Sequence, residues 1–182
     1  MAKDVAVLAG GCFWCTEAVF NDVVGIQSVE SGYTGGEVAS PTYKQVCGGG
    51  TGHAEAIRIT FDPEVLGYGD LLDIFFAVHD PTQLNRQGND VGTQYRSAIF
   101  PQTPEQEEQA GQARERAQAG WGGKIVTTIE PMAEWWPAED YHKSYWEGEG
   151  QRNPYCVATI PPKLQKLRKS FQARVKSAGA EA

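Results

Sequence analysis

The segment VAVLAGGCFWCTEAVFNDV, residues 5–23, decides the start of the fold. Residues 5–9 are short, apolar and β-rich, which predicts a buried strand. Gly10 and Gly11 break that strand. Apolar side chains then recur near helical spacing, so residues 13–23 are expected to form a helix. Cys12 therefore falls at a strand-to-helix junction, at or near the N-terminus of the helix.

The rest of the chain alternates strands and helices. Strands are predicted at 26–32, 54–61, 97–100 and 125–129, and helices at 68–78, 104–119 and 163–175. Thr103 is expected to cap the second of these helices, with Pro104 at its first position and Gln106 completing a capping box. Residues 134–146 are expected to be partly helical, and 32–43 and 80–96 to be loops. The alternation favours a two-layer α/β domain.

The composition is that of a globular protein with one domain. The chain has 182 residues, of which 41% are hydrophobic and 21% charged, so it can bury a core without disulfides. A formal net charge of −7 argues against nucleic acid or an anionic membrane as the main partner. No apolar run approaches the roughly 20 residues of a membrane span. The N-terminal residues also lack the apolar stretch of a signal peptide, so a cytoplasmic location is expected.

The four cysteines are too sparse for a disulfide scaffold, and their placement calls for a chemical explanation. A cysteine is nucleophilic as its thiolate, and a helix N-terminus favours an anion through its free N–H groups and its dipole. Cys12 is therefore the best candidate nucleophile, with a buried core cysteine as the alternative. Cys47 lies in a glycine-rich segment and is expected to be buried and inert.

The Cys-x-x-Cys of residues 12–15 encloses two large aromatic residues. Phe13 and Trp14 can build an apolar wall beside the sulfur, suited to a small methyl or alkyl group, or they can pack in the core. Zinc is another use of such a pair, but a closed site needs four ligands. The remaining cysteines and histidines include no second ligand pair. Metal binding is therefore disfavoured.

A series of motifs runs in order through nearly the whole chain. The motifs are Gly11-Cys12-Phe13-Trp14, Glu17-Ala18-Val19-Phe20, Gly32-Tyr33-Thr34-Gly35-Gly36, Pro41-Thr42-Tyr43, Thr51-Gly52-His53-Ala54-Glu55, His79-Asp80-Pro81-Thr82, Asn85-Arg86-Gln87-Gly88-Asn89-Asp90, Gly92-Thr93-Gln94-Tyr95-Arg96-Ser97, Ala138-Glu139-Asp140-Tyr141-His142 and Pro154-Tyr155-Cys156. Together they resemble the signature of the A-type peptide-methionine sulfoxide reductases, which repair one epimer of methionine sulfoxide.

The resemblance implies an α+β fold, a two-layer α/β sandwich with a mixed sheet and a ferredoxin-like core, extended loops and a C-terminal tail. Residues 1–182 would form a single domain, with 147–182 as the tail and terminal helix. The implied activity is thiol-dependent reduction of methionine S-sulfoxide, in oxidised proteins or free. A monomer is expected, with no nucleic acid or membrane partner.

The chemistry of sulfoxide reduction by a thiol requires a thiolate and an acid for the oxygen. The resemblance implies that Cys12 supplies the first and Glu55 the second, because burial keeps a carboxylic acid protonated near neutrality. Cys12 would attack the sulfoxide sulfur and become a sulfenic acid as methionine leaves. An alternative is that Glu55 is the exposed member of an edge strand.

The oxygen also needs hydrogen-bond donors, and the methyl group needs an apolar pocket. The resemblance assigns the donors to the phenols of Tyr43 and Tyr95. It assigns the pocket to Phe13 and Trp14, with Asp90 organising it through hydrogen bonds. The alternatives are that the tyrosines pack as lids and that Asp90 caps a turn.

A second thiol must then condense with the sulfenic acid to a disulfide. Cys15 lies three residues after Cys12 and could meet it across one helical turn. Cys156 resembles the tail position of the recycling cysteine in several relatives and lies in a segment expected to be mobile, so it is preferred. A relay through both is open. Thioredoxin is expected to reduce the disulfide, and no cofactor is expected on the protein.

Two other classes of function compete with this one. The Cys-x-x-Cys could serve a general thiol–disulfide oxidoreductase or peroxidase, which would be indifferent to sulfoxide chirality. It could also belong to a non-enzymatic zinc-binding or redox-sensing module, which would need neither Glu55 nor the tyrosines.

Overall fold

The main sheet runs through the middle of the molecule in the computed structural model, which describes residues 3–176. Its strands are β1 (Asp4–Gly10), β2 (Ile26–Thr34), β3 (Ala54–Phe61), β6 (Ser97–Ile99), β7 (Thr128–Ile129) and β8 (Trp136–Pro137). Their order is β7-β6-β1-β3-β2-β8. All neighbours pair antiparallel except β6 and β7, which pair parallel, so the sheet is mixed as expected.

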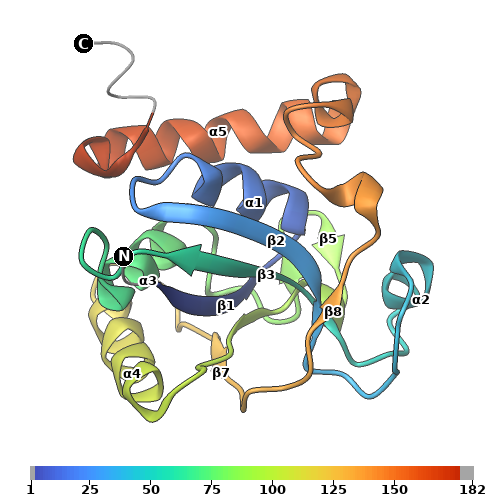
Figure 1. Cartoon of the computed structure of the whole chain (residues 1–182), viewed down its shortest axis with the longest axis horizontal. Coiled ribbons are helices and arrows are strands. Elements are labelled where there is room, and N and C mark those ends of the chain that lie inside the picture. Colours follow the sequence, from blue (N-terminus) through green and yellow to red (C-terminus); the bar gives the residue numbers. More distant parts are fainter. Residues whose placement is uncertain (1–2, 177–182) are drawn as a thin grey trace.

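The helices gather on one face of this sheet (Figure 1). They are α1 (Phe13–Asn21), α3 (Tyr68–Val78), α4 (Pro104–Gln118) and α5 (Pro154–Ser170), with α2 (Tyr43–Cys47) standing apart at one side. A two-stranded hairpin, β4 (Arg86–Gln87) with β5 (Asp90–Val91), and four short 3-10 helices, η1 (Thr93–Tyr95), η2 (Asp140–His142), η3 (Glu149–Arg152) and η4 (Gln172–Arg174), complete the described elements. The result is an α+β fold with a helical layer on a mixed sheet.

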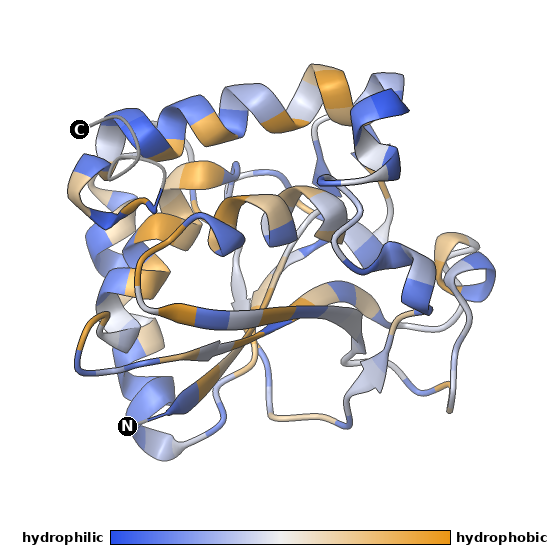
Figure 2. Ribbon diagram, turned by 45° about the horizontal axis from the view of Figure 1, so that its top comes forward, coloured by the Kyte–Doolittle hydropathy of each residue, from blue (hydrophilic) through white to orange (hydrophobic). Residues whose placement is uncertain are grey.

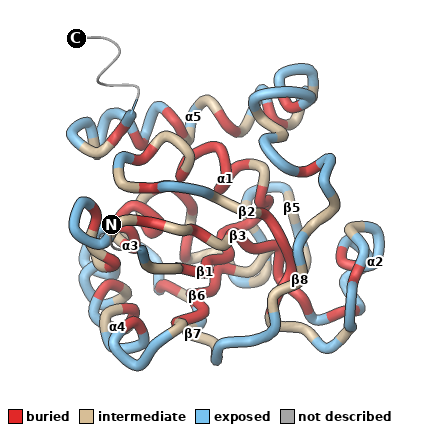
Figure 3. The backbone as a smooth tube through the Cα atoms, viewed as in Figure 1, coloured by how far each residue is buried: buried red, intermediate tan, exposed pale blue. Residues whose placement is uncertain are grey.

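Strand β1 divides its side chains between two buried clusters because successive residues point to opposite faces. Ala6 and Leu8 join the large cluster under α1, α3 and α5. Val7 and Ala9 join a smaller cluster on the other face. The buried segments therefore concentrate between the sheet and the helical layer (Figure 3). The strand predicted at residues 5–9 lies inside β1, and the helix predicted at 13–23 begins where expected and ends two residues earlier.

Helix α5 differs from the prediction of a mobile segment followed by a helix at 163–175. It begins at Pro154, where the Asn153 side chain accepts a hydrogen bond from the Tyr155 N–H at 2.9 Å, and it continues through Pro161 and Pro162. Its buried side chains recur at helical spacing, namely Cys156, Ile160, Leu164 and Leu167. This apolar stripe faces the layer below (Figure 2), and burying it stabilises the helix despite the two prolines. Cys156 is therefore buried in a helix in this structure, and not in an irregular tail.

Cys47 also differs from its prediction. It is the last residue of α2 and is exposed, whereas its neighbour Val46 supplies the buried side chain of that helix. Thr42 starts α2 with a capping box to Gln45, inside a region expected to be irregular. The glycines that follow carry no side chains to cover the thiol.

Three further segments are more irregular or more ordered than expected. The strand predicted at 125–129 is reduced to Thr128–Ile129, and the partly helical stretch 134–146 holds a two-residue strand and the short turn η2. The loop at 80–96 contains the β4–β5 hairpin and η1. Among the described residues, no helix is both long and apolar enough to cross a membrane.

Candidate active site

Cys12 stands directly before the first turn of α1, as the sequence predicts. The preceding Gly11 has φ +93°, and a Cβ there would lie 2.7 Å from the Cβ and Cγ of Gln87. An L side chain fits neither that φ nor that space. The glycine thus lets the chain turn sharply from β1 into α1 under the β4–β5 hairpin, and this turn places the Cys12 thiol.

The thiols of Cys12 and Cys15 form an interacting pair one helical turn apart. The Cys15 N–H donates to the Cys12 carbonyl at 3.1 Å, and both residues are buried. The side-chain hydrogen bond from Cys12 lowers the pKa of Cys15 to about 7, against the effect of burial. The same hydrogen bond, together with burial, raises the pKa of Cys12. The pair therefore loses its first proton near neutrality and holds the second tightly.

Glu55 lies on β3, an interior strand, with 1% of its surface exposed. The alternative of an exposed edge position is wrong. Its Oε1 accepts a hydrogen bond from the Phe13 N–H at 3.2 Å, while Oε2 is buried without a partner. Burial, the largest cause, raises the pKa of this carboxyl to about 8. Glu55 is therefore a protonated acid at neutral pH, with one oxygen free for another molecule.

Tyr43 and Tyr95 reach the same neighbourhood from different elements. Tyr43 begins α2 and its N–H donates to Glu139 Oε2 at 3.0 Å, whereas Tyr95 ends η1. Burial and then the nearby Glu55 raise the pKa of both phenols, so both keep their protons. Both phenols lie near the exposed Cys47 thiol and act to lower its pKa against the effect of partial burial. The tyrosines are thus hydrogen-bond donors grouped around the Glu55 carboxyl.

Phe13 and Trp14 have different surroundings. Phe13 is fully buried and its ring stacks on Tyr43 with the centroids 6.2 Å apart. Trp14 is half-buried, and its ring Nε1–H donates to His142 Nδ1 at 2.9 Å. It also stacks on Tyr145 at 4.1 Å. Phe13 is a core residue that supports the site, and Trp14 is the aromatic wall that remains accessible.

Asp90 and Cys156 are both tied to the start of α5. The Tyr155 phenol donates a hydrogen bond to Asp90 Oδ2. Cys156 follows Tyr155 in the chain and is fully buried, and the nearby Cys15 adds to burial in raising its pKa to about 11. Cys156 therefore lies close to Cys15, the second thiol of the pair, and stays protonated.

Several residues at the site were not among the predicted ones. Glu139 accepts hydrogen bonds from the Tyr33 phenol at 2.9 Å and from the Tyr43 N–H, so it fixes the start of α2. Thr159 and Lys163 of α5 line a cavity with both thiols. A signal for the α5 pair was present, since Tyr155, Thr159 and Lys163 recur every four residues. This spacing places the three residues on one face only because the helix begins at Pro154.

Metal ligands are not gathered at this site or at any other within residues 3–176. No group of three cysteine, histidine, aspartate or glutamate side chains there could hold a metal ion. The available donors near the thiol pair are instead a carboxylic acid, phenols and one lysine.

Comparison of this chain with known proteins identifies its family. The family described as peptide methionine sulfoxide reductase matches residues 4–175. The chain belongs to the peptide methionine sulfoxide reductases. The MsrA of Erwinia tasmaniensis is 68% identical over 173 residues, which cover 95% of this chain and 97% of that one. This reductase is accordingly an oxidoreductase acting on methionine sulfoxide.

Solved structures of relatives share the fold of this reductase. Mxr1 from Saccharomyces cerevisiae in its reduced form superposes with a TM-score of 0.75 at 37% identity, covering 84% of this chain and 86% of that one. Mxr1 in complex with Trx2 superposes with a TM-score of 0.55 at 26% identity, covering 79% and 84%.

Proposed function

We propose that this reductase acts on the S epimer of methionine sulfoxide, free or within oxidised proteins, through a sulfenic acid on Cys12. The observation that carries the proposal is the buried Oε2 of Glu55, which has no partner in the chain. An uncharged carboxyl with a free oxygen is suited to donate a proton to a sulfoxide oxygen. The other oxygen of the same carboxyl, Oε1, accepts a hydrogen bond from the Phe13 N–H in the first turn of α1.

In the first step the thiol pair provides the nucleophile. Its single negative charge moves to Cys12 when Cys15 accepts the shared proton, so Cys15 serves as the base. The Cys12 thiolate then attacks the sulfoxide sulfur while Glu55 donates one proton to the oxygen, and the resulting hydroxyl passes to the Cys12 sulfur as the substrate sulfur loses its bonds to both. Methionine leaves with two electrons gained from Cys12, which becomes a sulfenic acid. Tyr43 and Tyr95 would hold the oxygen while charge develops on it.

The substrate methyl group would contact Trp14, with Phe13 as the rigid support behind it. His142 accepts the indole N–H and fixes the plane of this wall. Asp90 would organise the opposite side through the Tyr155 phenol.

In the second step we assign the resolving thiol to Cys15, because it already interacts with Cys12 and has the lower pKa. Cys156 is buried in α5 and has a raised pKa, so it suits a later exchange with Cys15 better than a first attack. An external dithiol then reduces the disulfide. Thioredoxin is the reductant that we propose, supported by the complex of the related Mxr1 with Trx2.

The deciding experiment is a thioredoxin-coupled assay with the separated sulfoxide epimers. We expect turnover of the S epimer and none of the R epimer. Turnover of the R epimer alone, or of neither, would refute the proposal. A Cys12→Ser variant that still reduced methionine sulfoxide would refute the role of Cys12, and Cys47→Ser serves as the matched control.

The order of the thiols can be read by peptide mapping. The reduced enzyme is given one equivalent of substrate without reductant and is then alkylated and digested. A bridge between Cys12 and Cys15 is expected in the wild type, and a bridge between Cys12 and Cys156 in Cys15→Ser. A wild-type bridge that includes Cys156 and omits Cys15 would reverse the proposed order.

One observation also favours general thiol–disulfide exchange, namely the hydrogen-bonded Cys12–Cys15 pair with its low first pKa. That activity requires neither Glu55 nor the tyrosines. General thiol–disulfide exchange would be favoured if the wild type did not reduce methionine sulfoxide and if Glu55→Gln reduced insulin at the wild-type rate.

A further inference from the structure

A small cavity of ≈ 180 Å³ lies on the α5 side of the thiol pair. The residues that line it include Cys12, Cys15, Tyr155, Thr159 and Lys163. The three residues from α5 follow one another at intervals of four, so they lie along one face of that helix. Neither Glu55 nor the two site tyrosines line this cavity. It therefore approaches the thiols from a side that the proposed chemistry of the sulfoxide oxygen does not use.

Thr159 is the α5 residue in contact with the pair. Its Oγ1 lies 3.7 Å from Cys15 Sγ, and its hydroxyl donates to the Tyr155 carbonyl at 2.7 Å. Either atom of the Thr159–Cys15 contact can be the donor, and this hydrogen bond also lowers the pKa of Cys15, though less than Lys163 does. A neutral hydroxyl does not cancel the negative charge of a thiolate, which a nearby cation can.

Lys163 supplies a positive charge at the rim of this cavity. Its Nζ donates to the Val78 carbonyl at the end of α3, at 3.4 Å, which holds the flexible side chain in place. The residue is half-buried, so water screens its charge only in part. The titratable groups that face Cys15 are Cys12 just before α1, Glu55 on β3, Asp90 on β5, and Tyr155, Cys156 and Lys163 on α5. Among these groups, Lys163 is the one that carries a positive charge.

We propose that Lys163 is a positioning residue of the redox cycle, whose ammonium group holds Cys15 as the thiolate that first takes the Cys12 proton and later attacks the Cys12 sulfenic acid. The proposal rests on the role given to Cys15 above. Before the attack, Cys15 releases to solvent the proton that it took from Cys12 and is again a thiolate. In the attack the Cys15–Cys12 S–S bond forms and the S–O bond of the sulfenic acid breaks. The departing hydroxide takes one proton from solvent and leaves as water. The direction of the Cys15 pKa, lowered first by Cys12 and then by Lys163, agrees with this arrangement.

The test is a pH titration of the fully reduced enzyme followed by the ultraviolet absorbance of its thiolates. The pKa of Cys47 is raised by burial, and that of Cys156 is raised to about 11, so ionisation near neutrality reports the pair. Lys163→Gln removes the charge but keeps a donor for the Val78 carbonyl. We expect its midpoint to rise by about half to one pH unit, a threefold to tenfold fall in the ionisation constant of the pair.

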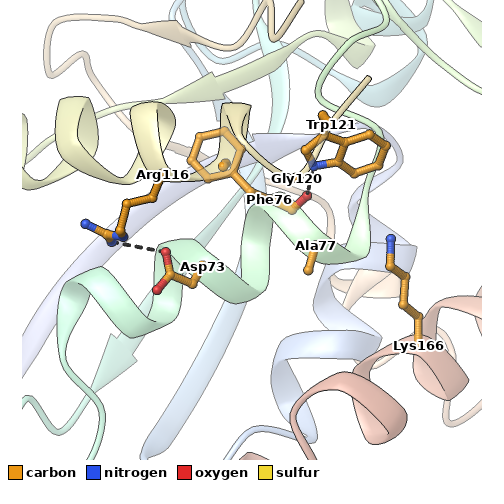
Figure 4. A pocket seen from close by; sticks show the side chains of 8 residues that line it. Asp73, Phe76, Ala77, Arg116, Gly120, Trp121 and Lys166 are labelled. Atoms are coloured by element: carbon orange, nitrogen blue, oxygen red, sulfur yellow. Dashed lines mark hydrogen bonds and ion pairs between the residues drawn. The ribbon is translucent and has the colours of Figure 1, made fainter. Parts of the chain in front are cut away.

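Two variants separate charge from packing. Lys163→Arg keeps the charge and is expected to keep the wild-type midpoint. Lys166→Gln loses the same charge less than one turn further along α5. Figure 4 shows Lys166 in a separate cavity of ≈ 490 Å³ beside Trp121, with its Nζ 5.0 Å from the ring centroid. This control is expected to leave the midpoint unchanged.

The outcomes are distinct from those for the proposed function. An unchanged midpoint in Lys163→Gln, or an equal rise in Lys163→Arg or Lys166→Gln, would overturn the role of Lys163. If the peptide map still contains the Cys12–Cys15 bridge in that case, the resolving role of Cys15 stands. If the bridge lacks Cys15, the attack assigned to its thiolate fails, whatever the midpoint does.

Discussion

The Phe13 N–H donates to Glu55 Oε1 at 3.2 Å, and this hydrogen bond joins strand β3 to the first turn of α1. Phe13 follows Cys12 directly, so the acid and the nucleophile are fixed relative to each other by one contact. The bond uses one carboxyl oxygen and leaves Oε2 without a partner. A substitution that keeps the first oxygen and removes the proton on the second therefore tests the chemistry without breaking the contact.

Glu55→Gln is that substitution, because its amide oxygen can still accept from Phe13. We expect the rate of methionine formation in a single turnover to fall about 10²-fold to 10⁴-fold at pH 7, the usual effect of losing a general acid. In the wild type the rate should also decline above pH 8, since the pKa of Glu55 is about 8 and the acid is then lost. A wild-type rate in Glu55→Gln would reject the acid role.

The same pKa predicts how stability depends on pH. The pKa of about 8 in the folded state lies above the ordinary glutamate pKa of 4.5 that applies to the unfolded chain. The folded state thus binds the proton more tightly, and this contribution is complete below pH 4.5 and lost as the pH rises through 8. As the pH rises from 4.5 to 8, the free energy of unfolding of Glu55→Gln should therefore increase by about 3–5 kcal/mol relative to that of the wild type, as measured by urea unfolding.

Glu130→Gln is the control for that experiment because its pKa is shifted the other way. Arg96 donates to both oxygens of Glu130, at 2.9 and 3.1 Å, and these bonds lower its pKa although burial opposes them. Its contribution is present at neutral pH and is lost only on acidification. The difference between Glu130→Gln and the wild type should stay constant from pH 6 to 8, and a slope like that of Glu55→Gln would contradict the assignment.

The phenols of Tyr43 and Tyr95 are expected to act in the transition state. Each Tyr→Phe change should lower kcat/KM about tenfold to a hundredfold, because a donor to the developing oxygen charge is lost. Tyr68→Phe is the control, since the Tyr68 hydroxyl is buried without a partner and belongs to the core. It should leave kcat/KM unchanged and not lower stability. Equal losses in all three variants would indicate a packing effect.

The sequence was sufficient for elements whose signal is local. Thr103 caps α4 as predicted, accepting from the Gln106 N–H at 3.1 Å, although the Gln106 side chain accepts from the Gln102 N–H in place of the N-cap. The strand–glycine–helix pattern around Cys12 was likewise readable. The fold class followed from the family resemblance and is confirmed by the mixed sheet and the related structures.

What the sequence could not supply depends on contacts between distant segments. The burial of Cys156 arises from an apolar stripe that α5 presents to α1, while Pro161 and Pro162 argue locally against a helix there. The exposure of Cys47 depends on α2 standing at the side of the sheet (Figure 1). The contacts of Lys163 join α5 to the end of α3, 85 residues away in the chain.

A pair of glycine substitutions tests the turn that places Cys12. Gly11→Ala forces a side chain into φ +93° with its Cβ 2.7 Å from Gln87, so we expect a loss of about 1–3 kcal/mol in unfolding free energy and a lower single-turnover rate. Gly111→Ala lies within α4 with nothing within 4 Å of the added Cβ, and should gain about 1 kcal/mol with the rate unchanged. Urea unfolding and single-turnover kinetics measure both variants. A Gly11→Ala enzyme as stable and active as the wild type would mean that the turn does not depend on glycine.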